Sequence, residues 1–334
     1  MAGLRTRLWL VAKTVLAVGI VAAVGLQFAR ILRQPALNPY PFDLRVGYLV
    51  PAGVLYLLAH CCWGSFWVRL LRSQGVHVGL VYGLRAYFVS QYGKYVPGKA
   101  WVVFIRVALL RGVDGGRPLA VGVTATYETL TSMAAGALLA AALIPRLGVL
   151  PEAVSPNVGW VVALALLPLA LAVLNKLAAR RVARLRGPGG VPLPSPPLGL
   201  LAQGMVHGVV GWALLGLCVS LGVAAVVPGD PGWQPAAHYP ADVGAMALAY
   251  VSGFFVLVAP GGLGVRELLL EAAIRPRFAP DLGAEVAAGL GVVIALVLRF
   301  AWTLAEVVVV LGLYFFCRPP AAAPPPADHG PTNA

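Results

Sequence analysis

The sequence has little charge for its length, and this shortage excludes a soluble globular fold. Only 11% of the 334 residues are Asp, Glu, Lys or Arg, whereas 60% are hydrophobic. A soluble domain usually carries about a quarter charged residues, and a single soluble core cannot bury so much apolar surface. The composition therefore predicts an all-α polytopic integral membrane protein, because helices satisfy their own backbone hydrogen bonds in lipid.

Acidic residues are much rarer than basic residues in this sequence. The chain has 12 acidic and 25 basic residues, which gives a formal net charge of +13. In a soluble protein this excess would suggest a nucleic-acid partner. In a membrane protein, Lys and Arg mark cytoplasmic loops and contacts with anionic lipid headgroups. We therefore expect membrane lipids as partners and no nucleic acid.

Motifs for metal, redox and nucleotide chemistry are missing. The four cysteines form no C-x-x-C motif, and the five histidines form no H-E-x-x-H motif. No G-x-x-x-x-G-K-[ST] sequence is present, so ATP hydrolysis by this chain is not expected. No D-x-D or D-D pair lies within an apolar run. The sequence thus predicts no metal, no cofactor and no catalytic residue, and the protein is not expected to be an enzyme.

Long apolar runs are present instead, each near the length of about 20 residues that crosses a bilayer as a helix. They cover 8–29, 46–71, 118–144, 158–175, 198–227 and 283–316. We expect about six full spans. The first is too long for a signal peptide and lacks a small-residue cleavage site, so it should be retained. The last is too long for one straight span and should tilt, kink or break near Arg299.

Two further regions, 80–112 and 242–277, each hold two apolar pieces joined at a Pro-Gly step. Proline removes a backbone donor and glycine lets the chain turn, so both steps should break a helix. We predict two re-entrant helical hairpins, which bring the count of membrane segments to eight. The predicted helix breaks are Pro97, Gly98, Pro260, Gly261, Gly262 and Gly264.

Charges in the loops indicate the orientation. Basic residues cluster at 176–186, whereas the loop at 228–242 has acidic residues and no Lys or Arg. The positive-inside rule places the first in the cytoplasm and the second outside, although Arg30, Arg33 and Arg146 oppose this scheme. Both termini should then be cytoplasmic, in the plasma (inner) membrane.

This orientation gives each half of the chain a span–hairpin–span pattern, and the two halves run in opposite directions. The half-repeats cover about 46–144 and 198–316, with a linking helix at 158–175. Inverted repeats with broken helices are a recurring plan of transporters. A surface helix at 98–112 and an ordinary span at 242–259 form the alternative. The expected division is one transmembrane domain and one disordered Pro/Ala-rich tail, 1–318 and 319–334.

Cations follow both Pro-Gly steps. A helix that starts at a break within the membrane presents free N–H groups and its positive dipole end to an anion. Lys99 and Arg106 follow the first break, and Arg266 follows the second. We predict that these residues, together with Lys94, bind an anionic phosphate headgroup. For Lys94 and Arg111, a side chain that extends to the membrane surface is the alternative.

Glu128 and Arg299 lie inside predicted spans, where a lone charge is costly and usually paired. Each sits in the third element of its half-repeat, so we predict that they pair. Glu306, on the same run as Arg299, is a rival partner. Two acidic residues and one arginine, spaced four residues apart, follow the second Pro-Gly step. The first acid, Glu267, is a further intramembrane charge. We expect the three side chains to stabilise their helix through i,i+4 ion pairs. These residues are Glu267, Glu271 and Arg275.

The charged motifs resemble a known membrane family. The sequence is similar to the flippase-like region of lysylphosphatidylglycerol synthases in four features. They are Y-V-P-G-K-A-W…R, then Glu128, then A-P-G-G-L-G-V-R-E, and the late Arg299. The resemblance covers about 1–318, and P-G-G-L-G-V-R-E is its most specific piece. It implies movement of an aminoacylated phospholipid between leaflets. The synthases carry an aminoacyl-transferase domain after this region; this chain stops at Ala334, so we expect no lysyl transfer.

The sequence therefore predicts a lipid flippase or transporter. It should bind an anionic phospholipid or a lipid-linked phosphate headgroup and move it between leaflets. The alternative is a membrane enzyme, or an accessory subunit, that acts on lipid-linked sugars or phosphates. A partner enzyme that supplies the lipid is expected beside either function.

Overall fold

The computed structural model describes most of the chain, and the described part is helical. It covers residues 43–95, 100–113, 117–147, 195–227, 235–256 and 264–316, with single positions at 22, 26, 29–33, 37, 158–159, 162, 173, 176, 180 and 262. No strand occurs in these ranges. The predicted span at 8–29, the linking helix at 158–175 and the tail at 319–334 fall largely or wholly outside the described residues.

Among the described residues, four helices are long and apolar enough to cross a membrane. They confirm the predicted spans at 46–71, 118–144, 198–227 and 283–316. Even the shortest, with 25 residues, is about 37 Å long at the α-helical rise of about 1.5 Å per residue, and exceeds the hydrocarbon thickness of about 30 Å. The four are α2 (Leu49–Ser73), α5 (Pro118–Leu143), α7 (Leu198–Val226) and α10 (Ala284–Phe316).

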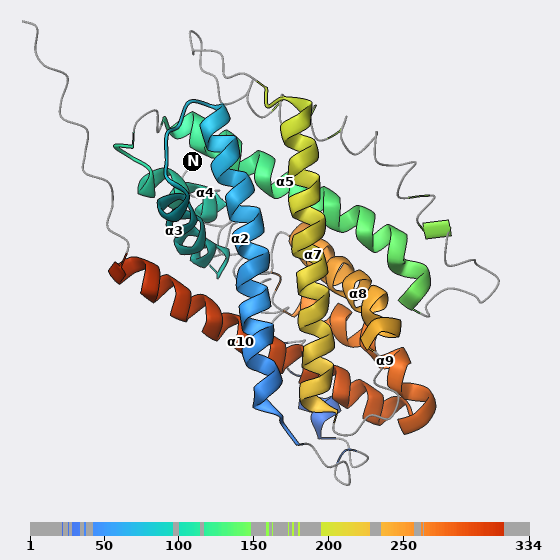
Figure 1. The fold of residues 1–334 in the computed structure, drawn as a ribbon. Coiled ribbons are helices and arrows are strands. Elements are labelled where there is room, and N and C mark those ends of the chain that lie inside the picture. The colour runs from blue at the N-terminus through green and yellow to red at the C-terminus, as the bar shows by residue number, and fades with distance from the viewer. Residues whose placement is uncertain are drawn as a thin grey trace, which may run out of the picture.

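Helices α2 and α7 lie side by side at the centre of the molecule, and α5 and α10 cross them obliquely (Figure 1). Glycines on α7 permit the close approach. A Cβ atom on Gly204 would lie 2.2 Å from the ring of Phe66, and one on Gly211 would lie 2.2 Å from Trp63 Nε1. Helices associate in lipid by close packing of this kind, because no hydrophobic force drives them together there.

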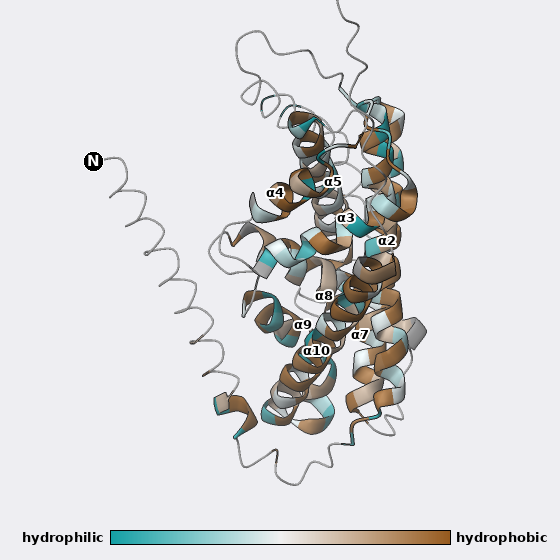
Figure 2. Cartoon of the chain, turned by 90° about the vertical axis from the view of Figure 1, so that its left-hand side faces the viewer, coloured by the Kyte–Doolittle hydropathy of each residue, from teal (hydrophilic) through white to brown (hydrophobic). Residues whose placement is uncertain are grey.

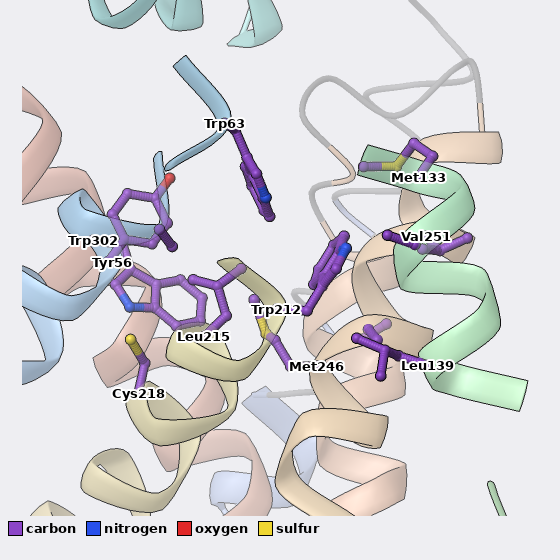
Figure 3. Packing of buried hydrophobic residues seen from close by; sticks show 14 of the residues in the cluster. Tyr56, Trp63, Met133, Leu139, Trp212, Leu215, Cys218, Met246, Val251 and Trp302 are labelled. Atoms are coloured by element: carbon purple, nitrogen blue, oxygen red, sulfur yellow. The ribbon is translucent and has the colours of Figure 1, made fainter. Parts of the chain in front are cut away.

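Tryptophan side chains of α2 and α7 form hydrogen bonds with α5. Trp212 Nε1 donates to the Ser132 carbonyl oxygen at 2.9 Å, and Trp67 Nε1 donates to Thr124 Oγ1 at 3.2 Å. The Trp212 ring also packs on Trp63, with centroids 5.1 Å apart (Figure 3). The indole N–H groups of Trp212 and Trp67 are thus hydrogen-bonded, as is usual for buried polar groups.

The outer faces of the long helices are apolar (Figure 2). On α10, large exposed side chains recur at helical spacing and define one face of the helix. We assign this face to lipid, since it is too large a hydrophobic surface for water. The residues are Phe300, Leu304, Val308, Leu311 and Phe315. The helix itself is continuous through Arg299, so the alternative of a break at this residue is wrong.

The region after α2 folds as a helical hairpin, which we call the first hairpin. It consists of α3 (Leu80–Gln91), a 3-10 turn η3 (Tyr92–Tyr95) and α4 (Ala100–Leu109). Its helices are antiparallel: the Tyr82 hydroxyl donates to the Leu109 carbonyl at 2.9 Å, and at the other end Gly93 touches the backbone of Val102.

The region after α7 folds in the same manner, as the second hairpin. It consists of α8 (Pro235–Phe255) and α9 (Val265–Leu282). Helix α8 begins inside the segment predicted as an outer loop. Gly253, near the end of α8, lies against Gly262, just before α9, while Asp242 lies within electrostatic reach of Arg277. The two helices are therefore antiparallel.

Candidate functional site

Charged side chains from both hairpins and from two long helices gather in the interior. They are costly there unless they are paired, because the medium solvates charge poorly. In the ion-paired cluster that they form, counted over the described residues, there are four cations and three carboxylates. The cluster consists of Lys94, Arg106, Arg266, Arg299, Glu128, Glu267 and Glu306.

Arg106 of α4 is the most completely enclosed of these cations, with 1% of its surface exposed. Its Nη1 donates to Glu128 Oε2 at 2.9 Å, and its Nε donates to Ser90 Oγ at 3.1 Å. The guanidinium also lies over two aromatic rings, 4.4 Å from the centroid of Trp67 and 4.6 Å from that of Tyr87. Ion pairing and cation–π contacts thus surround the group.

Two arginines, Arg266 of the second hairpin and Arg299 of α10, face one carboxylate of the second hairpin. Glu267 Oε1 accepts from Arg299 Nη1 at 3.2 Å and lies 3.6 Å from Arg266 Nη2. The other oxygen, Oε2, accepts from the Gly264 backbone N–H at 2.8 Å. Gly264 has a φ of +86°, a left-handed conformation that favours glycine. The Glu267 carboxylate therefore occupies the place at the start of α9 where we predicted a bound anion.

Lys94 points into the bundle from the turn of the first hairpin. Its Nζ and the Tyr56 hydroxyl both bind Glu306 Oε1. Only 16% of the Lys94 side chain is exposed, so the alternative that it extends to the membrane surface is wrong. Tyr56 in turn stacks on Trp302, with centroids 5.3 Å apart (Figure 3).

The predicted Glu128–Arg299 pair is wrong. Glu128 pairs with Arg106 and Arg299 pairs with Glu267, while the rival partner Glu306 binds Lys94. The physical reason is that each hairpin inserts a helix with its own charge beside the following span. In the first half the hairpin supplies the cation and the span the acid; in the second half the signs are reversed.

Two tyrosines that we did not predict give the halves a common feature. Tyr87 and Pro97 have the same spacing as Tyr250 and Pro260, and each tyrosine follows an alanine. Arg266 lies 4.6 Å from the centroid of Tyr250, the distance that separates Arg106 from Tyr87. This repeated Ala-Tyr pair was the sequence signal that could have located both arginine-binding rings.

His60 of α2 is another member of the site that sequence reasoning missed. It is 2% exposed and packs among the rings of Tyr56, Trp63, Tyr87 and Phe88. Its Nδ1 lies 3.5 Å from the Tyr87 hydroxyl. Its Nε2 has no hydrogen-bond partner among the residues that the structure describes. No sequence motif surrounds this histidine, so only the fold reveals its surroundings.

The remaining predicted residues divide by whether the structure describes them. Gly262 and Gly264 both have positive φ angles, of +70° and +86°, as expected at a helix break. Glu271 and Arg275 form the predicted i,i+4 pair, at 3.8 Å. Within the described ranges, no three His, Cys, Asp or Glu side chains are grouped to hold a metal ion. The other predicted site residues lie outside the described part: Pro97, Gly98, Lys99, Pro260 and Gly261.

Comparison with known proteins adds no assignment to this geometry. The sequence matches no protein-family model, and no curated protein is significantly similar to it. The chain is a helical membrane protein, and its described part contains four helices long and apolar enough to span the bilayer.

Proposed function

We propose that this protein binds a phosphate-bearing, anionic lipid headgroup and moves the lipid between the two leaflets of the plasma membrane. One observation carries the proposal: the buried charge cluster, to which both hairpins contribute and in which cations outnumber carboxylates. The resemblance to a flippase-like membrane region leads to the same function from the sequence.

The chemistry of the cluster favours a phosphate. Arg266 and Arg299 both face the single carboxylate of Glu267. Guanidinium groups form paired, charge-assisted hydrogen bonds with carboxylate and phosphate oxygens. A phosphate group between these two arginines would neutralise the excess positive charge. In a bilayer, the abundant phosphates belong to lipids.

The carboxylates of the cluster act as internal stand-ins for that ligand. Glu267 binds both the Gly264 N–H at the start of α9 and the two arginines. A helix N-terminus favours an anion through its free N–H groups and its dipole. In the proposed complex, a headgroup phosphate would take over contacts that Glu267 makes with the two arginines.

We further propose that both hairpins are re-entrant and that the halves form an inverted repeat. Helix α4 has ten residues and is about 15 Å long, half of the hydrocarbon thickness, so its first turn would lie near mid-membrane. The matched Tyr–Arg contacts and the reversed charges of the two halves support this arrangement. Transporters of this plan bind their cargo where the broken helices meet.

The test is lipid binding by variants that remove one arginine. In Arg266→Gln and in Arg299→Gln, Glu267 keeps one arginine and the Gly264 N–H, so the fold should persist. Loss of one charge-assisted contact costs about 1.5–3 kcal/mol, which is roughly tenfold to hundredfold in affinity. Arg275→Gln is the control, because this arginine is also on α9 but its side chain is 50% exposed.

The measurement is retention of phosphatidylglycerol, against phosphatidylcholine, on the purified protein by mass spectrometry. We expect both arginine variants to lose phosphatidylglycerol while the control keeps it. Lys99→Gln, the predicted residue outside the described part, should behave like Arg266→Gln. Equal retention by Arg266→Gln, Arg299→Gln and the parent, with an intact monomer peak in each, would show that the cluster is structural.

A further inference from the structure

His60 is a buried ionisable group that the proposed function does not use. Its Nε2 is buried and has no hydrogen-bond partner among the described residues. Such an unsatisfied polar atom costs about 1–3 kcal/mol and calls for an explanation. Aromatic rings surround the imidazole, and the charge cluster lies within electrostatic reach of it.

Charges surround His60 on several sides. Electrostatic interactions reach it from three cations and one carboxylate, and two tyrosine rings pack on it. One of these cations, Arg106, is ion-paired with Glu128. The titratable and charged neighbours, from α2, α3, η3, α4, α9 and α10, are Tyr56, Tyr87, Lys94, Arg106, Arg266 and Glu306.

We propose that His60 is the proton-binding residue of the anion site, so that an anionic headgroup and one proton bind, and move, together. The inference rests on the proposed function and deepens it, because it names a coupled ion. With its hydrogen on Nδ1, toward Tyr87, the imidazole has a lone pair on Nε2 that can bind one proton from the bulk solution when the headgroup binds.

The coupling follows from like-charge repulsion. A proton on His60 adds a positive charge beside Lys94, Arg106 and Arg266, and this is unfavourable while their charge is in excess. An anion bound to the cations offsets that repulsion and so favours the protonated imidazole. Linkage is reciprocal, so the proton must tighten anion binding by the same factor.

His60 suits this role better than the carboxylates of the cluster. Glu128, Glu267 and Glu306 each accept hydrogen bonds from a cation, and a proton on any of them would weaken an ion pair. A proton on His60 Nε2 breaks no hydrogen bond between described residues.

The experiment compares the full chain with His60→Asn in nanodiscs of phosphatidylglycerol or phosphatidylcholine. Phosphatidylglycerol is a phosphodiester and keeps its charge between about pH 5.5 and about pH 8, the range in which histidine titrates. Affinity for the lipid is measured across this range, and proton uptake on binding is followed with a dye in weak buffer. Glycerophosphoglycerol, the free headgroup, serves as the soluble probe. His207→Asn is the control, because His207 lies outside the cluster and contacts the Gln203 carbonyl of its own helix.

We expect the parent and His207→Asn to bind phosphatidylglycerol more tightly as the pH falls, by at most about tenfold per pH unit for one linked proton. Both should take up protons on binding, and His60→Asn should lose both effects. If that variant does not fold, His60→Gln replaces it, and the absence of proton uptake by the parent is sufficient to overturn the inference.

Each result has a separate meaning. Binding without pH dependence, or with the same pH dependence in His60→Asn, overturns the role of His60 and leaves the lipid function standing. No binding of any phosphate probe at any pH overturns both. Linked binding of glycerophosphoglycerol without the lipid supports the role of His60 but shows that the cargo is a soluble phosphodiester.

Discussion

The two hairpins share a Pro-Gly step followed by an arginine, yet they neutralise that arginine differently. Arg106 of the first hairpin has Glu128 as its carboxylate partner and is enclosed by two rings and a serine. Arg266 of the second hairpin shares Glu267 with Arg299, and at a longer distance. The same sequence pattern thus places an arginine in the interior in both hairpins but does not determine how that arginine is neutralised. The first arginine has one close carboxylate partner, whereas Arg266 and Arg299 share one carboxylate, and our proposal assigns the ligand to this second arrangement.

Backbone packing differs in the same sense. A Cβ atom on Gly93 of the first hairpin would lie 2.6 Å from the backbone nitrogen of Val102, which is too close for any side chain. A Cβ atom on Gly253 of the second hairpin would meet its nearest neighbour, Arg266 Cβ, at an ordinary 3.5 Å. The first hairpin is therefore closed at its turn, whereas the second has room beside its arginine.

The largest loss of folding stability should come from breaking the Arg106–Glu128 ion pair of the first hairpin. Arg106→Gln strands the Glu128 carboxylate in the interior, and Glu128→Gln strands the guanidinium. Breaking a buried ion pair on one side costs about 3–5 kcal/mol of folding free energy. We expect either variant to lose most of its monomer peak in size-exclusion chromatography and to unfold at a lower temperature. Arg266→Gln should keep both.

The double variant Arg106→Gln with Glu128→Gln tests whether the effect belongs to the pair. Because it leaves no unpaired charge, it should be more stable than either single variant. Additive losses would mean that Arg106 and Glu128 act separately, and the contrast between the hairpins would fail.

A smaller effect should separate the two glycines. Gly93→Ala forces the turn of the first hairpin away from α4, and overpacking of this kind costs about 1–3 kcal/mol. Gly253→Ala adds a methyl group at a normal contact distance and should change stability by less than about 0.5 kcal/mol. Thermal unfolding of the two variants, followed by tryptophan fluorescence, gives the comparison directly. A greater loss for Gly253→Ala than for Gly93→Ala would reverse our account of the packing.

The parts of this fold that could be predicted from the sequence depend on local properties. Helices α2, α5, α7 and α10 are confirmed because the length and hydropathy of a run decide whether it can span lipid. The helix breaks are local too, since proline and glycine act on their own backbone.

Partner choice could not be predicted, because it depends on which helices pack together. Glu128 and Arg299 occupy equivalent places in the half-repeats, which favours a pair between them. However, α4 packs against α5, and its Arg106 forms the ion pair with Glu128 instead. Likewise, nothing around His60 in the sequence announces a site. Its neighbours come from distant parts of the chain, and only the packing of the hairpins against α2 and α10 brings them together.

The most direct test of the central claim is transfer of acyl-labelled fluorescent phosphatidylglycerol between leaflets of reconstituted vesicles. The account predicts that the parent and Arg275→Gln transfer the lipid faster than protein-free vesicles, and that Arg266→Gln is slowed by roughly tenfold or more. Transfer by Arg266→Gln at the parent's rate, or a parent no faster than protein-free vesicles, would contradict it.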